Sequence, residues 1–172
     1  MKTLLARLAM IGVAMTLGAG GPVHAAATPS GALQVEVVGT GRPLLMIPGL
    51  NSSAEVWRQT CLALKDVQCH LVQLPGFAGA APADPLPDDF LPAMRDQLLA
   101  YVHEQKLDHP AVIGHSLGGV VTLDMAVQEP DALGPLVIVD AVPFYAGMQN
   151  PQATAQSVRT LAGQGRLGGL AG

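Results

Sequence analysis

The order of apolar and polar residues along the chain predicts a series of short strands. Residues 33–37 alternate apolar and polar, which is typical of a half-buried strand, whereas residues 44–47 are apolar throughout. Further strands are predicted at about 68–73, 111–113 and 136–139. Uninterrupted apolar runs of this length are expected of strands that are buried on both faces, so we expect 44–47, 111–113 and 136–139 to lie inside a sheet.

Three helices are predicted between these strands, at 54–65, 90–106 and 117–128. Ser52 or Ser53 can cap the first helix, and apolar residues recur at three- and four-residue spacing along the second. Alternating strands and helices predict an α/β fold, in which a mostly parallel sheet has helices on both faces.

The N-terminus is predicted to be a secretory signal. Lys2 and Arg7 precede an apolar stretch from Leu8 to Ala19. Val23 and Ala25 then supply the small residues of a cleavage site. The alternative is an uncleaved membrane anchor, but the apolar run is short for a bilayer span. We therefore expect residues 1–25 to be removed, with export to the periplasm or the extracellular space and no stable membrane anchor afterwards.

Export also bears on the two cysteines, Cys61 and Cys69. They can form a disulfide between a helix end and the following strand, since an oxidising compartment permits it. Alternatively, they are two small buried apolar residues. Without a matching pair of histidines, they do not predict a zinc site.

Charge and composition narrow the possible partners. The 172 residues carry a formal net charge of −4, with no cluster of Lys or Arg and only 3% aromatic residues, so nothing indicates nucleic-acid binding.

The length predicts one domain. From about residue 149 the chain becomes glycine-rich and loses periodicity, so we expect a domain at 26–148 and a poorly ordered or non-native tail at 149–172.

The candidate chemistry lies in Gly114-His115-Ser116-Leu117-Gly118, which matches the G-x-S-x-G pattern. The motif directly follows a predicted buried strand and directly opens a predicted helix. Such a turn would make Ser116 project from the sheet edge, and side chains at positions 114 and 118 would clash there. The alternative is a serine that merely caps a helix after a glycine turn. The context favours a catalytic nucleophile.

With this motif the chain resembles the α/β-hydrolase superfamily of serine esterases and lipases. Residues 47–53 are similar to the family's oxyanion loop, with Pro48-Gly49 where many members have His-Gly. Residues 73–79 resemble its D-x-P-G-x-G loop, with Gln73 in place of the acid. The resemblance spans roughly 33–145 and implies a partial α/β-hydrolase fold that lacks the C-terminal strands.

The resemblance also implies the roles of site residues. Ser116 would attack a small-molecule acyl substrate, and the backbone amides of Leu117 and Leu50 would form the oxyanion hole, with Asn51 as second choice for the latter. Two such donors typically stabilise the transition state by several kcal/mol. No cofactor is implied, because no phosphate loop, dinucleotide fingerprint or metal-ligand cluster is present.

The triad implied by the family is incomplete in this chain. The family order places an acid and then a histidine after the serine, but all five histidines precede Ser116. His70 and His115 are poor candidates for the base. Asp140 follows a predicted strand and is a candidate triad acid; alternatively, it caps a turn. Only 56 residues follow Ser116, so we expect a truncated hydrolase.

Three hypotheses follow. The first is a serine hydrolase acting on ester or other acyl bonds, impaired because the histidine is absent. The second is a non-catalytic exported fragment or pseudo-hydrolase, with strand 136–139 left as an exposed apolar edge. The third, a thioesterase or peptidase, differs from the first only in its substrate pocket.

Overall fold

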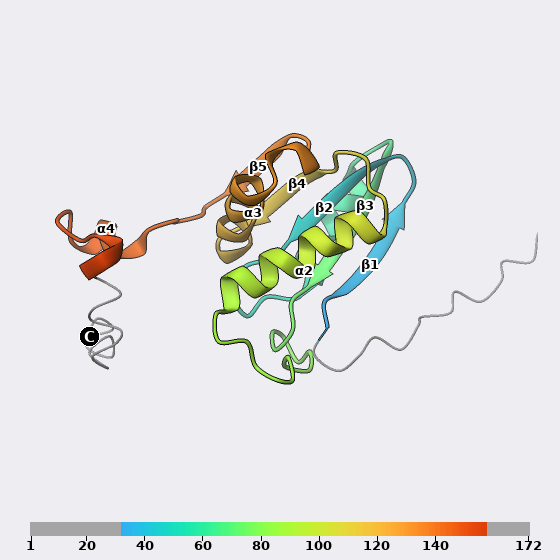
Figure 1. The fold of residues 1–172 in the computed structure, drawn as a ribbon. Helices are drawn as coiled ribbons and strands as arrows, with labels where there is room; N and C mark the ends of the chain where they lie inside the picture. The colour runs from blue at the N-terminus through green and yellow to red at the C-terminus, as the bar shows by residue number, and fades with distance from the viewer. Residues whose placement is uncertain (1–31, 158–172) are drawn as a thin grey trace, which may run out of the picture.

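The computed structural model describes residues 32–157, in which five strands form one sheet (Figure 1). Neither the predicted signal, residues 1–25, nor residues 158–172 of the predicted tail lie within the described part. The strands are β1 (Gln34–Gly39), β2 (Arg42–Ile47), β3 (Val67–Gln73), β4 (Ala111–His115) and β5 (Leu136–Val139). Their order across the sheet is β1-β3-β2-β4-β5.

The sheet is mostly parallel, as the sequence predicts. Only β1 runs antiparallel to its neighbour β3, and the pairs β2–β3, β2–β4 and β4–β5 are parallel. Parallel pairing needs long crossover connections, which the helices supply. Consequently, β2, β3, β4 and β5 all end at the same edge of the sheet. The segments that follow them carry every residue that the sequence proposes for the site.

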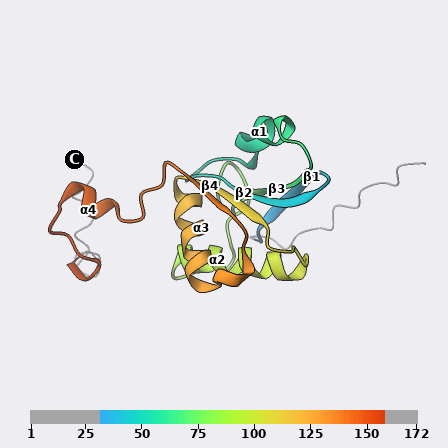
Figure 2. The ribbon, with the colours of Figure 1, turned by 90° about the horizontal axis from the view of Figure 1, so that it is seen from above.

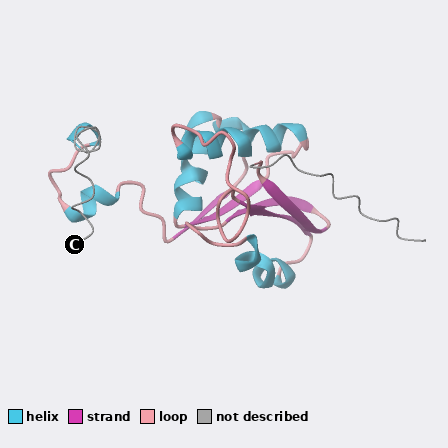
Figure 3. Cartoon of the chain, turned by 90° about the horizontal axis from the view of Figure 1, so that it is seen from below, coloured by secondary structure: helices cyan, strands magenta, loops and turns pink. Residues whose placement is uncertain are grey.

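Helices cover both faces of the sheet (Figure 2). α2 (Phe90–Glu104) and α3 (Leu117–Gln128) lie on one face, and α1 (Arg58–Ala63) lies on the other, as Figure 3 also shows. This cover explains the apolar run in β2, because side chains on either face of the strand meet a helix layer. Leu45, Met46 and Ile47 accordingly have no exposed surface.

The apolar side of α2 supplies much of the core on its face of the sheet. Met94 and Leu98 are fully buried and Val102 nearly so. Burying each such side chain stabilises a fold by roughly 1.5–3 kcal/mol. Arg95 of α2 also pairs with Asp124 of α3, with 3.2 Å between nitrogen and oxygen, which joins the two helices beside the core.

The first helix is shorter than the predicted 54–65. It begins with a 3-10 turn, η1 (Ala54–Trp57), and α1 ends at Ala63. Of the two candidate caps, Ser53 is the one used: its Oγ accepts a hydrogen bond from the Glu55 amide at 3.1 Å. Cys61 and Cys69 form a disulfide that ties α1 to β3. The alternative of two unpaired cysteines is thus wrong.

The bounds of β5 agree with prediction, but its burial does not. The sequence predicts a buried strand, whereas Val137 is 51% exposed and Ile138 and Val139 are each 37% exposed. The reason is its place at the end of the strand order: β5 has a neighbour on one side only, and α1 does not reach its second face. Among residues 32–157, β5 is therefore an edge strand with partly exposed apolar side chains, and the second hypothesis stays a prediction.

A short helix that the sequence did not predict, α4 (Tyr145–Gln149), follows β5. Figures 1 and 2 show it apart from the sheet, at the end of an extended segment. Five residues are too few to produce a helical period in the sequence, so the pattern did not predict this helix. The division into a domain at 26–148 and a tail at 149–172 stays a prediction.

Candidate functional site

Ser116 occupies a sharp turn between a strand and a helix. β4 ends at the preceding residue and α3 begins at the following one. The backbone of Ser116 has φ 51° and ψ −116°, a conformation that residues other than glycine rarely adopt. Its amide donates a hydrogen bond to the Val139 carbonyl at 2.9 Å, which holds the turn beside the end of β5. Ser116 therefore lies at the sheet edge, as the motif predicts.

The two glycines of the motif are required by close contacts. A Cβ on Gly114 would lie 2.4 Å from the carbonyl oxygen of Gly118 and 2.5 Å from Thr122 Oγ1. A Cβ on Gly118 would lie 2.4 Å from the carbonyl oxygen of Ile47 and 2.5 Å from that of Pro48. Real Cβ atoms do not approach this closely, so any side chain would push α3 away from β4 or β2. The predicted clash at both positions is present.

The loop after β2 lies directly against the Ser116 turn. A Cβ built on Gly49 would be 3.3 Å from Ser116 Cβ and 2.9 Å from His115 Nδ1. The Ser52 amide donates to the Gly49 carbonyl at 3.1 Å, which closes this loop into a turn. Leu50 is the next residue after Gly49, and its side chain is exposed. The segment that carries the second candidate oxyanion donor thus adjoins the serine.

The other candidate donor is the amide of Leu117. Leu117 is the first residue of α3, and amides in the first turn of a helix have no carbonyl acceptor within that helix. The helix dipole adds partial positive charge at the same end. Negative charge that develops beside Ser116 would be stabilised by this amide and by the helix terminus together.

Asp140 follows β5 at the same edge. Its predecessor Val139 accepts the hydrogen bond from the Ser116 amide, so Asp140 is one residue away from a direct contact with the turn. Asp140 is exposed and has φ 48°, a left-handed backbone conformation. No residue in the range 32–157 forms an ion pair with it. The structure places this carboxylate near the edge, without a partner that it could orient.

His70 is buried between the sheet and α2. It lies in β3 with 3% of its surface exposed, and its Nδ1 is 2.8 Å from the Tyr101 hydroxyl oxygen on α2. Its Nε2 is buried without a hydrogen-bond partner. Burial lowers the pKa of His70 below its usual 6.5, so the ring is neutral near pH 7. It serves the packing between sheet and helix, as expected for a poor candidate base.

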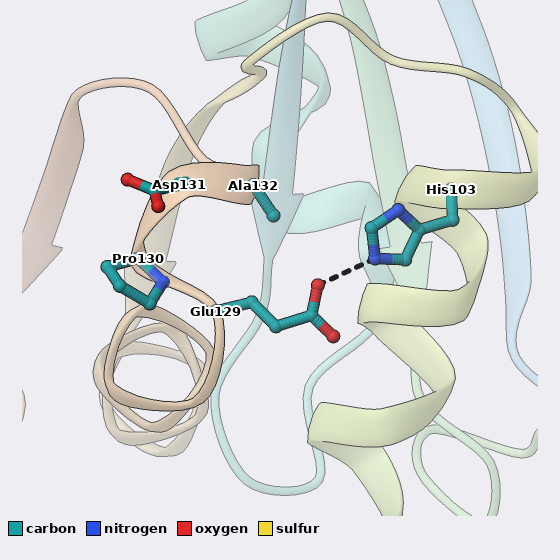
Figure 4. Close-up of a pocket in the computed structure, with 5 residues that line it drawn as sticks. All are labelled: His103, Glu129, Pro130, Asp131 and Ala132. Atoms are coloured by element: carbon teal, nitrogen blue, oxygen red, sulfur yellow. Dashed lines mark hydrogen bonds and ion pairs between the residues drawn. The ribbon is translucent and has the colours of Figure 1, made fainter.

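Two further histidines lie far from the serine. His103 on α2 pairs with Glu129, with 2.7 Å between nitrogen and oxygen, and both line a cavity of about 370 Å³ (Figure 4). This cavity lies at the C-terminal end of α3, and 12 helical residues separate it from Ser116. At 1.5 Å per residue that is about 18 Å, too far for catalysis at the serine. His109 pairs with the adjacent Asp108 and is exposed.

His115 is the remaining histidine of the described part. Although it precedes the serine, its ring lies beside Gly49, and no hydrogen bond joins it to Ser116. Among residues 32–157, then, no histidine is placed to accept the serine proton.

Gln73 connects two loops through hydrogen bonds that the sequence did not reveal. Its Oε1 accepts a hydrogen bond from the Ala54 amide at 3.0 Å, and its Nε2 donates to the carbonyls of Phe77 and Leu74 at 2.9 and 3.2 Å. One side chain therefore connects the segment after β2 to the loop after β3. A carboxylate, which the resemblance implies at this position, could accept from Ala54 but could not donate. The only signal in the sequence was the replaced acid.

Features of other site classes are not found in the part of the chain that the structure describes. It contains no group of three or more His, Cys, Asp or Glu side chains able to hold a metal ion. Within the same residues, no helix has both the length and the apolar character that crossing a bilayer requires.

The family model that matches this chain has the description alpha/beta hydrolase family, and the match covers residues 44–171. It includes the loop after β2, the Ser116 turn and β5. The chain belongs to the alpha/beta hydrolase family.

Individual relatives are hydrolases. A pimeloyl-[acyl-carrier protein] methyl ester esterase of Vibrio atlanticus is 32% identical over 123 residues, which cover 71% of this chain and 45% of the relative. The corresponding esterase of Aeromonas salmonicida is 32% identical, with 74% and 49% covered. The chain thus spans about half the length of the curated relatives that it matches.

Solved structures agree with this assignment. An esterase from a marine microorganism has a TM-score of 0.56 and 28% identity, with 63% of this chain and 41% of that chain covered. The epoxide hydrolase CorEH has a TM-score of 0.57 and 25% identity, with 66% and 40% covered. Together the comparisons show an alpha/beta hydrolase with esterase relatives.

Proposed function

We propose that this alpha/beta hydrolase chain carries the nucleophile of a serine esterase, and that Ser116 forms an acyl-enzyme. The observation that supports this most directly is the backbone of Ser116, held at φ 51° between β4 and α3 with the Gly49 loop against it. Strained backbone conformations of this kind cluster at active sites. A serine that merely capped a helix would use the extended backbone and a side-chain hydrogen bond to the helix amides, and Ser116 has neither.

In the proposed reaction, Ser116 Oγ attacks the carbonyl carbon of an ester and its proton passes to a base. The amides of Leu117 and Leu50 stabilise the tetrahedral oxyanion, and collapse of this intermediate expels the alcohol. Water then hydrolyses the acyl-enzyme through a second tetrahedral intermediate. The substrate class is a small carboxylic ester or a related acyl compound, in keeping with the methyl ester esterases among the relatives.

None of the residues 32–157 is placed to act as the general base that Ser116 needs. A serine hydroxyl is a weak nucleophile unless a neighbouring group takes its proton. All five histidines precede Ser116 in the chain, and none of those described contacts it. Asp140 would act as the triad acid only where a histidine stood between it and Ser116. We therefore expect this chain by itself to turn substrate over several orders of magnitude more slowly than a complete triad.

We also propose that the chain is exported after removal of residues 1–25. The sequence pattern of a secretory signal supports this, and so does the Cys61–Cys69 disulfide, since such bonds persist mainly in oxidising compartments. Expression with the leader followed by cell fractionation tests it. Recovery of the chain in the cytoplasm with the leader intact would contradict export.

A non-catalytic role is the second candidate. Two observations favour it: the described residues place no base at Ser116, and β5 exposes an apolar edge that is suited to binding. A pseudo-hydrolase of this kind would keep the fold and show no chemistry at the serine.

Hydrolysis of p-nitrophenyl esters by the purified chain, compared with Ser116→Ala, separates the two candidates. The esterase proposal predicts slow release of p-nitrophenol that falls to the uncatalysed rate in the variant. Equal rates in the two proteins would favour the non-catalytic role. Circular dichroism of both proteins is the matched control, because loss of fold would also remove the difference.

A further inference from the structure

The direction of the Leu50 N–H is set by a turn in the loop after β2 (residues 48–53). The Ser52 amide donates to the Gly49 carbonyl at 3.1 Å, which directs this carbonyl into the turn. The N–H and C=O groups of a trans peptide point in opposite directions, so the Leu50 N–H is directed out of the turn. No hydrogen bond among residues 32–157 uses this N–H. Leu50 therefore carries a free donor whose position depends on how the loop is held.

The loop after β2 is held on both sides of Leu50. Before Leu50, the loop adjoins the serine turn, since a Cβ built on Gly49 would be 3.3 Å from Ser116 Cβ. After Leu50, the Ala54 amide at the end of the loop donates to Gln73 Oε1 at 3.0 Å. The position of the free donor is thus decided by the serine turn and by Gln73 together.

The Gln73 side chain is suited to hold this loop in one place. Gln73 is the last residue of β3, so its backbone belongs to the sheet, and it is half-buried. Its Nε2 donates to the carbonyls of Phe77 and Leu74 at 2.9 and 3.2 Å. These bonds fix the orientation of the carboxamide, because exchange of its oxygen and nitrogen would set an N–H group against the Ala54 N–H. Consequently, only Oε1 faces the loop after β2.

A second connection between the loops after β2 and β3 is weaker. Asn51 Oδ1 accepts a hydrogen bond from the Ala78 amide at 3.4 Å, longer than the usual range of about 2.7–3.2 Å. Asn51 is also exposed, so water competes for its carboxamide. Each hydrogen bond of the half-buried Gln73 is shorter than this one. The place of the loop is therefore decided mainly at Gln73.

We propose that Gln73 is a positioning residue of the esterase site, which holds the loop after β2 so that the Leu50 N–H stays directed at the oxyanion beside Ser116. The inference rests on the proposed function, in which Ser116 is the nucleophile. Oxyanion donors act at about 2.7–3.1 Å, and a misplacement of about 1 Å can slow a reaction about a hundredfold. Gln73 does not touch the substrate and acts only through the backbone of the loop.

The two proposed oxyanion donors differ in what holds them. Leu117 is the first residue of α3, and the close approaches at Gly114 and Gly118 set that helix against β4 and the end of β2. Leu50 lies in a loop, outside any helix or strand. A change at Gln73 should therefore displace the Leu50 amide and leave the Leu117 amide in place.

The two halves of the Gln73 carboxamide separate a positioning role from a merely stabilising one. At neutral pH, Gln73→Glu keeps an acceptor for the Ala54 N–H but cannot donate to Phe77 or Leu74. Gln73→Met has a similar length and loses all of these bonds. The matched control is Gln34→Met, because Gln34 lies opposite Gln73 in the β1–β3 register and is exposed.

Labelling of Ser116 by a fluorophosphonate with added imidazole measures the effect in the full chain. Ser116 Oγ forms a bond to phosphorus, fluoride leaves, and imidazole takes the serine proton. The phosphonyl oxygen gains negative charge, which the same two amides would stabilise. Gln73→Met should label slower than the wild type by about tenfold or more, and Gln73→Glu and Gln34→Met should stay within about threefold of it.

Urea unfolding of the same proteins keeps stability apart from positioning. Gln73→Met and Gln73→Glu should both be less stable than the wild type, since both leave the carbonyls of Phe77 and Leu74 without their donor. A merely stabilising role would therefore slow labelling in both variants. A positioning role slows it only where the bond to Ala54 is lost.

Amide NMR relaxation tests the same claim without a reaction at Ser116. In the wild type and in Gln73→Glu, the Leu50 amide should have the order parameter of rigid backbone, about 0.85. In Gln73→Met it should fall toward about 0.6, which is typical of flexible backbone. The Leu117 amide should keep the rigid value in all of these proteins.

Several results would overturn the inference. They are equal labelling rates in Gln73→Met and the wild type, labelling of Gln73→Glu as slow as that of Gln73→Met, and an unchanged Leu50 order parameter in Gln73→Met. If the wild type gives no adduct on Ser116, the proposed function fails, and with it the oxyanion hole that Gln73 would position. The two failures are distinguishable, because the former results leave wild-type labelling of Ser116 intact.

Discussion

The Ser116 turn and β5 are adjacent in space and differ in almost every physical respect. A hydrogen bond from the Ser116 amide to the Val139 carbonyl joins them at 2.9 Å. At the turn, added methyl groups would lie 2.4 Å from backbone oxygens. On β5, three consecutive apolar side chains are more than a third exposed.

The difference shows what each region is built to do. Close approaches at Gly49, Gly114 and Gly118 surround the Ser116 turn, and the serine has a strained backbone conformation there. β5 is held from one side only, so its sequence is constrained by strand propensity and little by packing. The turn is thus tightly constrained by its neighbours, whereas the strand is constrained on one side only.

The largest effect is expected for Gly118→Ala. The new Cβ would lie 2.4 Å from the Ile47 carbonyl oxygen, and backbone cannot move aside cheaply. We expect unfolding in urea to show a loss of about 3–5 kcal/mol, or no folded protein. A loss below about 1 kcal/mol would mean that the turn is far less tightly held than the contacts indicate.

Gln73→Leu should have the next largest effect, because it removes the connection between the two loops beside Ser116. Buried and half-buried donors and acceptors at Ala54, Leu74 and Phe77 would lose their partner, at about 1–3 kcal/mol. The matched control is Gln34→Leu at an exposed position of β1. Equal unfolding free energies for the two variants would argue against a connecting role.

The pH dependence of stability tests the packing between β3 and α2. Burial lowers the pKa of His70 below 6.5, so the unfolded chain binds this proton more readily than the folded protein. The stabilising contribution is complete above about pH 6.5 and is lost as the pH falls from there toward the folded-state pKa. The loss proceeds by at most about 1.4 kcal/mol per pH unit.

Urea unfolding at several pH values between 7.5 and 5 measures this slope in the wild type and in His70→Asn. The variant should have a flatter profile, whatever its absolute stability. Identical slopes would show that His70 does not titrate differently in the folded and unfolded states.

The smallest effect is expected for Val137→Ala on β5. Its side chain is 51% exposed and meets no helix on its face, so we expect a change within about 0.5 kcal/mol in dilute solution. A loss as large as that of Gly118→Ala would abolish the contrast between the two regions.

Local patterns predicted the elements beside the site well. α3 and β5 have the bounds that the sequence predicts, because glycines and Pro130 limit α3 and the turn residues limit β5. The turn at Ser116 also follows from a local motif, since a Cβ on Gly114 would clash with Gly118, only four residues away. The proximity of Gly49 to Ser116 was expected only through the family resemblance.

What the sequence did not reveal depends on distant neighbours. An apolar run predicts a buried strand, but burial of β5 is decided by whether another strand or helix covers it. The hydrogen bonds of Gln73 likewise join segments that meet only in the folded chain. The roles of Ser116, Asp140, Leu50 and Leu117 stay predictions.

Site-resolved labelling of Ser116 by a fluorophosphonate, with and without added imidazole, tests the central claim most directly. If Ser116 is a positioned nucleophile that lacks its base, labelling is slow in buffer and imidazole accelerates it. Peptide mass spectrometry should find the adduct on Ser116 and none in Ser116→Ala. Rapid stoichiometric labelling without imidazole would contradict the missing base, and an accelerated adduct on any other residue would contradict the nucleophile itself.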